Sequence, residues 1–226
     1  MSLGESILDH YELFLGKYIG VDKYTSGEYV IQLLGFDRTF KDCLTFASLG
    51  LSNYSNLINN SCEVIMPVDD DYDNCAVVFA NALFYVLQQQ MDFGRGTIIE
   101  GLDNIIADFS KRHNKTAIYF TESYVLPEEF SKIEDHLKMY IAFFISEKEL
   151  EFIHNYGCEE FENLLESSKA DIINLNRESI VWKKTAEKTV VETYIREDNK
   201  LIHLVINGEE IITTENQCKK YRITEV

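Results

Sequence analysis

Four aspartates stand within five residues, at Asp69, Asp70, Asp71 and Asp73. Clustered carboxylate oxygens can hold a hard cation such as Ca²⁺. An EF-hand loop, however, alternates its ligands and needs a glycine at the tight turn and a distal glutamate, and this stretch lacks all three features. Acidic residues before a helix also complement its positive end. We therefore predict no metal site here. The run is interpreted as a helix entrance that adds to an acidic surface, and its aspartates are the candidate contacts for a protein partner.

The other residue types that could do chemistry are scattered. The chain contains no G-x-S-x-G, no C-x-x-C and no zinc-ligand spacing. Gly94 and Gly96 flank Arg95. They lack the pattern of a phosphate-binding loop and are predicted to provide positive φ angles. The histidines are His10, His113, His136, His154 and His203, and the cysteines are Cys43, Cys62, Cys75, Cys158 and Cys218. An odd number of dispersed cysteines is typical of reduced thiols in a cytoplasm. The sequence thus predicts neither an enzyme nor a bound cofactor.

Charge is the most informative property of the composition. The formal net charge is −17 and the sequence pI is near 4.6. Residues 1–181 hold 13 Lys+Arg and 30 Asp+Glu, whereas residues 182–226 hold 8 of each. Such an acidic body argues against nucleic acid or an anionic membrane as ligand, since binding phosphates needs clustered cations. It favours a basic protein partner through complementary fields. The alternative is that the acidity serves only solubility.

Location follows from the apolar pattern. No apolar stretch reaches the length of a membrane span. The first fifteen residues lack a basic region followed by an uninterrupted apolar core, so they do not resemble a secretion signal. We expect a cytoplasmic protein.

The elements that would carry these residues can be predicted from periodicity. The run Met139 to Ile145 is apolar, aromatic and β-branched, which favours a strand buried on both faces. Ser146 and Glu149 then form a capping-box pattern at the start of a helix, Gly157 ends that helix, and a second helix follows. Further helices are expected at residues 4–19, stopped by Gly20, and at residues 74–91. Further strands are expected at residues 28–36, 43–52, 62–68 (ending at the edge-type Pro67), 116–121 and 172–182.

The residue pattern changes after Trp182. Residues 189–197, 201–206, 209–214 and 219–224 alternate apolar and polar residues, and Asn207-Gly208 is a strong hairpin signal. We predict an α+β fold with a mixed β-sheet sandwiched with helices over residues 1–182. A small C-terminal β-meander would occupy residues 183–226.

The serial order of these elements resembles the suppressor-of-fused domain family in its bacterial, immunity-protein-like form. The resemblance covers roughly residues 28–182. It is carried by FASLGLS (46–52), CEVIMP (62–67), the helix at 76–87, GRGTI (94–98) and the strand with two helices at 141–165. Arg177 also stands where the family usually has an arginine. The sequence lacks the tryptophan that the family often carries before the buried helix, and the meander lies outside the family pattern.

The resemblance implies a non-catalytic α/β sandwich that binds proteins. Bacterial members are similar to immunity proteins that neutralise toxins, many of which are nucleases with basic clefts. We therefore expect an immunity or antitoxin-type protein. Its acidic surface, including Asp69 to Asp73, would bind a cognate basic toxin and block it. The alternative is a regulatory scaffold that captures an extended peptide by strand addition.

Overall fold

The computed structural model of the protein describes residues 2–69, 74–133, 137–181, 201–206 and 209–214. The chain divides into two compact units, residues 1–181 and residues 182–226. Asp70, Asp71, Asp73, His136 and Cys218 lie outside the described residues.

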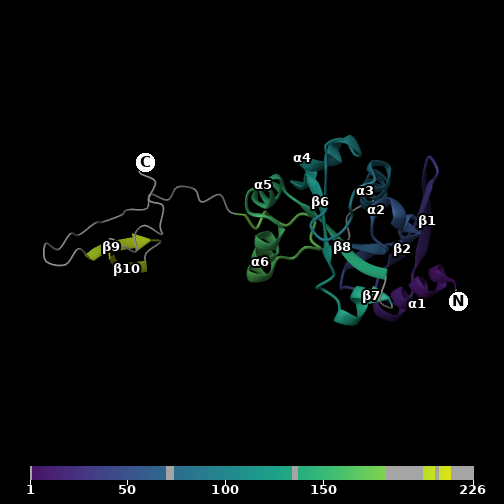
Figure 1. The fold of residues 1–226 in the computed structure, drawn as a ribbon, viewed down its shortest axis with the longest axis horizontal. Helices are drawn as coiled ribbons and strands as arrows, with labels where there is room; N and C mark the ends of the chain where they lie inside the picture. Colours follow the sequence, from purple (N-terminus) through teal and green to yellow (C-terminus); the bar gives the residue numbers. More distant parts are fainter. Residues whose placement is uncertain (1, 70–73, 134–136, 182–200, 207–208, 215–226) are drawn as a thin grey trace. The chain divides into compact units, whose positions relative to one another are not determined.

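A mixed β-sheet forms the centre of the first unit (Figure 1). Its strand order is β1-β2-β3-β4-β8-β6-β5, and the short β7 pairs with β8. Neighbouring strands run antiparallel except for β4 and β8, which are parallel. The strands are β1 Gly20–Ser26, β2 Tyr29–Phe36, β3 Cys43–Leu49, β4 Cys62–Asp69, β5 Ile98–Glu100, β6 Ala117–Glu122, β7 Lys132–Ile133 and β8 Leu137–Ile145. The predicted α+β class with a mixed sheet and helices is confirmed.

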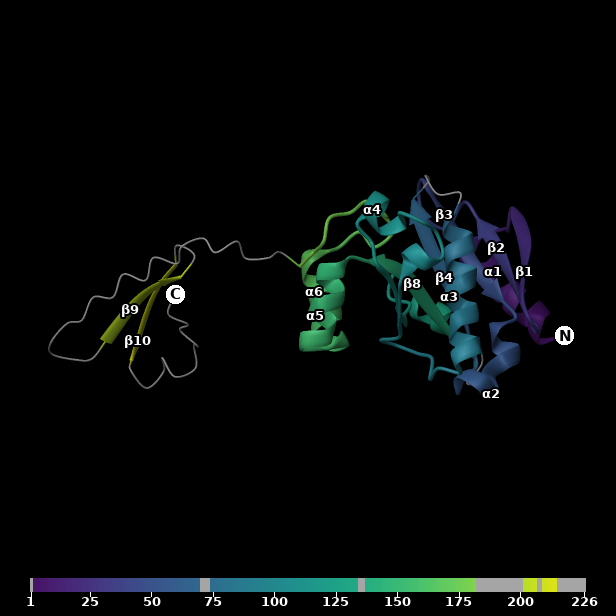
Figure 2. The same cartoon turned by 90° about the horizontal axis from the view of Figure 1, so that it is seen from above.

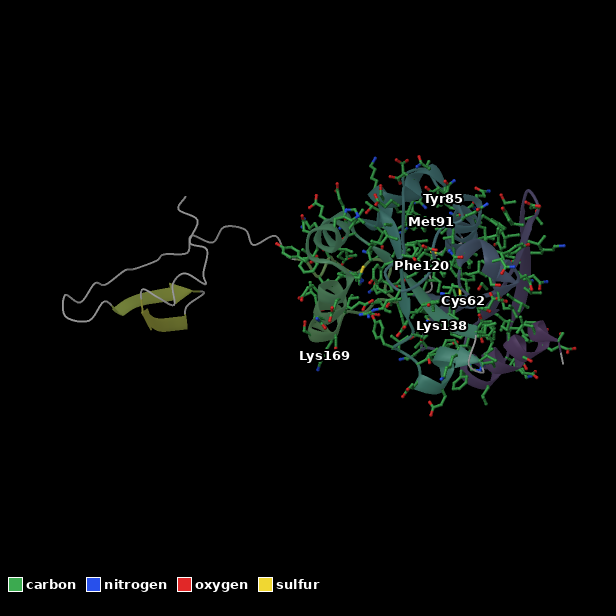
Figure 3. All side chains as sticks on the ribbon, viewed as in Figure 1. Cys62, Tyr85, Met91, Phe120, Lys138 and Lys169 are labelled. Carbon is green, nitrogen blue, oxygen red and sulfur yellow. The ribbon has the colours of Figure 1, made fainter. Side chains whose placement is uncertain are left out.

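One face of the sheet is covered by α3 (Cys75–Gln89), which lies over the strands in Figure 2. Its apolar residues share one hydrophobic core cluster with Val64 of β4 and Phe120 of β6, and both of these side chains are fully buried. Of the residues labelled in Figure 3, Cys62 and Phe120 are buried, whereas Lys169 is exposed. The almost wholly apolar sequence of α3 explains why it forms the centre of this half of the core.

The opposite face is covered by three helices, α1 (Leu3–Leu15), α5 (Glu147–Tyr156) and α6 (Cys158–Ser168). Their buried side chains form a second cluster with β8 and its neighbours. Because successive side chains of a strand point to opposite faces, the apolar run of β8 supplies both clusters, with Ile141 and Phe143 on this side and Ala142 and Phe144 on the other. The prediction of a central strand buried on both faces is confirmed.

The remaining short elements connect these layers. They are η1 Leu51–Tyr54, α2 Ser55–Ile58, η2 Leu102–Asn104, α4 Phe109–His113 and η3 Glu128–Ser131. In the described part of the chain, no helix combines the length and apolar character that crossing a bilayer requires.

In the N-terminal half, two predicted boundaries are wrong and one strand was not predicted. α1 ends at Leu15, because Gly16 takes a φ of +91° and stops the helix before Gly20. Residues 20–26 then form an edge strand that was not predicted, since its sequence is mostly polar. β4 does not end at Pro67 but continues to Asp69. Its pairing with β8 stops at Ile65, so Pro67 pairs only with β3 and its missing N–H disturbs no second ladder.

The strand predicted over residues 172–182 is also wrong for the described part, which is irregular through residue 181. The backbone N–H of Ile173 donates to Asp171 Oδ1 (3.2 Å), and that of Asn176 donates to Asn174 Oδ1 (2.9 Å). Asx turns of this kind bend the chain and occupy N–H groups that a sheet ladder would use.

In the second unit, β9 (Leu201–Ile206) and β10 (Glu209–Thr214) form an antiparallel pair. Ile206 pairs with Glu209, as expected for strands joined by two residues. The strands predicted at residues 189–197 and 219–224 lie outside the described residues.

Candidate protein-binding surface

Asp69 is the one described member of the predicted acidic contact run. It lies at the end of β4, where its Oδ1 accepts a hydrogen bond from the Leu175 N–H (3.0 Å) and its own N–H donates to the Ile173 carbonyl (3.2 Å). These bonds tie the irregular segment after α6 to the sheet. Asp69 therefore already holds a structural role.

Exposed carboxylates lie on α5, on α6 and just after α6. Ile153, Phe161 and Leu165 face the sheet and are buried. The exposed acidic residues of this region are Glu147, Glu151, Glu159, Glu160, Glu166 and Asp171. Tyr156 is 65% exposed, and its ring lies 4.7 Å from that of Phe152. We call this set the acidic helix face. Acidic groups around an exposed aromatic ring can attract a basic protein and provide an anchor for it.

The capping box at the start of α5 fixes one end of the acidic helix face. The Glu149 N–H donates to Ser146 Oγ (3.4 Å), and the Ser146 N–H donates to Glu149 Oε2 (2.8 Å). This confirms the predicted capping box, in which each residue satisfies a donor that the first turn leaves free.

Glu149 also forms a buried ion pair with Arg177. Arg177 Nη1 donates to Oε1, and Nη2 donates both to Oε2 (3.1 Å) and to the Phe144 carbonyl (3.2 Å). Only 7% of the Arg177 side chain is exposed, and none of the Glu149 side chain. Burial acts to raise the pKa of Glu149, but the hydrogen bonds and charge of Arg177 outweigh it and hold the pKa below its ordinary value. The arginine that stood out in the sequence thus locks α5 to the end of the first unit.

A second carboxylate attaches α6 to the sheet. Glu162 accepts hydrogen bonds from Tyr119 Oη (2.8 Å), Thr121 Oγ1 (2.6 Å) and Arg95 Nε (2.7 Å). Burial acts to raise the pKa of Glu162, and these donors lower it below the ordinary value. Gly96 also lies under α6 with a φ of +85°, which confirms the prediction for this glycine. Gly94 is not among the glycines with positive φ.

A third carboxylate, that of Glu63, is fully buried and was missed by the sequence analysis. It accepts hydrogen bonds from the hydroxyls of Ser48 (2.5 Å) and Ser52 (2.8 Å) and from the backbone N–H groups of Gly50 (2.9 Å) and Ser52 (3.1 Å). Burial raises its pKa, and the hydrogen bonds oppose that shift. A lone glutamate inside the apolar run CEVIMPV was the signal that could have identified this anchor.

The described histidines and cysteines do not form a reactive centre. His10 Nε2 lies 3.1 Å from the Phe130 carbonyl, and His154 Nε2 lies 3.6 Å from Glu100 Oε1. Cys62, Cys75 and Cys158 are free thiols, and burial raises the pKa of Cys75 to about 12. Among the described residues, no three His, Cys, Asp or Glu side chains come together as a metal site requires. The arrangement is one of rigid supports beneath a charged exterior.

A family model and a bacterial relative both match much of this chain. The family model described as Suppressor of fused protein matches residues 27–178. Immunity protein YqcF of Bacillus subtilis (strain 168) is 24% identical over 153 residues, which covers 64% of this chain and 78% of that protein.

Solved structures share the fold. A suppressor of fused homologue from Neisseria gonorrhoeae FA 1090 matches with a TM-score of 0.65 at 16% identity, covering 80% of this chain and 97% of that one. A chain of the Sufu-Fu complex matches with a TM-score of 0.54 at 13% identity, covering 78% and 91%. Drosophila Suppressor of Fused matches with a TM-score of 0.51 at 12% identity, covering 78% of this chain but only 50% of that protein. The chain belongs to the suppressor of fused family.

Proposed function

We propose that this chain is a non-catalytic binding protein of the immunity type, which neutralises a basic toxin by covering it with an acidic surface. The observation that carries the proposal is the position of the charge. Residues 1–181 hold the whole net charge of −17, and among their described carboxylates only Glu63 and Glu149 are buried. An exterior of one sign accelerates the approach of an oppositely charged partner and disfavours partners of like charge.

Two comparisons support this proposal. The Bacillus subtilis relative is named as an immunity protein. One of the structural matches is a chain of the Sufu-Fu complex, which is a protein-protein assembly. We further propose that the chain acts in the cytoplasm, in keeping with the free thiols of Cys62, Cys75 and Cys158.

Two acidic regions are proposed as contacts. The first is the run Asp69, Asp70, Asp71 and Asp73, of which Asp69 also holds Leu175. The second is the acidic helix face. Five of its six carboxylates belong to helices held in place by Glu149 and Glu162, so binding would cost little ordering of the backbone.

The decisive experiment co-expresses the chain with the toxin domains encoded beside its gene and measures binding across a range of salt concentrations. A variant combining Glu151→Lys, Glu159→Lys and Glu160→Lys should bind more slowly and lose most of the salt dependence. A matched control reverses Asp9, Asp37 and Asp42, which are also exposed but lie outside α5 and α6. The electrostatic mechanism is wrong if no neighbouring product binds, or if the association rate ignores salt.

A second candidate function is the capture of an extended peptide by strand addition. One observation favours it: among the strands that the structure describes, β1 pairs with β2 alone, and Val21 of β1 is 50% exposed. In an antiparallel ladder, every second residue of such an edge directs its N–H and C=O outward. Deleting residues 183–226 leaves β1 in place and distinguishes this site from one on the C-terminal unit. A partner that pairs with β1 should still bind the shortened chain.

A further inference from the structure

A groove of about 400 Å³ opens on the α1 side of the sheet. Its apolar lining includes Leu3 of α1, Val30 of β2 and Leu49 of β3. Its polar lining includes Lys23 of β1, Gln32 of β2 and Asn53 of η1. Ligand sites in proteins commonly combine apolar walls with a few polar groups in a volume of roughly 300–1,000 Å³.

The register of the strands explains the position of the groove. Lys23 pairs with Gln32, and Gln32 pairs with Leu49, so these three side chains lie in one row on the same face. The next row contains Leu34 and Ala47, which are buried in the cluster that α1 covers. α1 therefore covers the row of Leu34 and Ala47 but not the row of Lys23, Gln32 and Leu49. This second row forms the open floor of the groove.

The groove also contains an uncompensated positive charge. Among the described residues, the Lys23 ammonium has no carboxylate within ion-pair distance. Its neighbour Asp22 lies on the opposite face of β1, because side chains alternate along a strand. The first-turn carboxylate of α1, Glu5, accepts a hydrogen bond from the Ser2 N–H (2.7 Å). In a chain of net charge −17, this is a local site for an anion beside an apolar wall.

We propose that this groove binds the C-terminal residue of a partner polypeptide, with an apolar side chain against Val30 and Leu49 and the α-carboxylate on Lys23. A terminal residue carries both groups on one Cα, so both can enter a single small cavity. A strand from the middle of a partner chain would not offer both groups, because the side chain next to the apolar one would point away from the groove. The amides of Gln32 and Asn53 can donate to the second carboxylate oxygen. The proposal goes beyond the acidic-surface function and does not depend on it.

The test uses the full ¹⁵N-labelled chain and two probes that differ only in charge, N-acetyl-leucine and N-acetyl-leucine amide. Titration followed by NMR should shift the signals of Gln32, Leu49 and Asn53. The acid should bind about two- to fivefold more tightly than the amide, the range expected for one exposed ion pair.

Variants assign the effect to particular groups. Lys23→Met should remove the preference for the acid, and Val30→Asp should weaken the binding of both probes. Lys41→Met removes the same charge from an exposed site outside the groove and should change neither affinity. Equal affinity for acid and amide, signal shifts confined to other regions, or unchanged selectivity in Lys23→Met would each overturn the proposal. No toxin is used, so these results are independent of whether the immunity function holds.

Discussion

Replacing Arg177 with methionine should destabilise the first unit strongly, because it leaves the Glu149 carboxylate buried without its cation. Removing one partner of a buried pair typically costs about 3–5 kcal/mol. Glu149 would keep two backbone donors, the N–H groups of Ser146 (2.8 Å) and Ile180 (3.0 Å). We therefore expect a loss near the lower end, about 3 kcal/mol. With a urea m-value of about 2 kcal/mol/M, the midpoint should fall by about 1.5 M.

The pH dependence gives this prediction its sharpest form. In the native chain the pKa of Glu149 is lowered, so its contribution is complete above the unfolded value of 4.5 and is lost as pH falls through the folded pKa. In Arg177→Met, burial is no longer opposed by the cation, and the pKa of Glu149 should rise above 4.5. The variant can then neutralise Glu149 by taking up a proton. The stability gap between native and variant chains should narrow as pH falls from 7 towards 5.

The assay is urea unfolding followed by circular dichroism at 222 nm, at pH 7 and pH 5. Arg95→Met is the matched control, since Arg95 also pairs with a glutamate but 51% of its side chain is exposed. An exposed pair should cost less than about 1 kcal/mol. The double variant Arg177→Met with Glu149→Gln should be more stable than Arg177→Met alone. A loss below about 1 kcal/mol for Arg177→Met, or a gap that does not narrow in acid, would refute the reasoning.

Three further predictions follow from single sites. Gly96→Ala should lower the free energy of unfolding by about 1–3 kcal/mol, because φ is +85° and a Cβ would lie 2.7 Å from Cys158 Sγ. Adding Cys158→Ala removes the contact but not the backbone strain, so urea unfolding should show that only part of the loss is recovered. Burial lowers the pKa of Lys115 from 10.5 to about 8, so the buried ammonium costs stability below pH 8 and this cost disappears as pH approaches 10.5. Relative to Lys115→Met, the native chain should gain about 2 kcal/mol between pH 7 and pH 10, and a constant difference would contradict the shift. Changing Asp70 and Asp71 to Lys should slow association with a cognate toxin more than it speeds dissociation, and unchanged association rates in stopped-flow experiments would remove this run from the interface.

Local signals predicted much of the fold. The capping box at Ser146 and Glu149, the apolar helix α3 and the apolar strand β8 each depend on residues close in sequence, and all were recovered. The strand β1 was missed because an edge strand contacts one neighbour and needs little apolar alternation. Residues 172–181 were misread because their apolar side chains suggested a strand, whereas the asparagines between them bend the backbone.

The site was harder to predict than the fold, because its supports join residues distant in sequence. Arg177 was conspicuous as a cation in an acidic body, but its partner Glu149 lies 28 positions earlier and was assigned only to the capping box. Asp69 was predicted as a surface contact, and its bond to Leu175 spans 106 positions. No periodicity specifies such pairs. The groove at Lys23 required the strand register, which the sequence alone did not provide.

Three carboxylate anchors, two of them buried and one half-buried, relate the stability of the fold to its proposed function. Glu149, Glu162 and Glu63 each hold a different segment through several directed donors, so their burial is compensated by hydrogen bonds. Each anchor fixes a segment that reaches the surface: α5, α6 and the loop beside the groove. A surface fixed before contact loses less conformational entropy on binding than a flexible surface with the same charge. An acidic exterior alone would accelerate encounter with many basic proteins. Acidic groups held in fixed relative positions can select one partner, because a wrong arrangement of opposite charges leaves groups desolvated and unpaired.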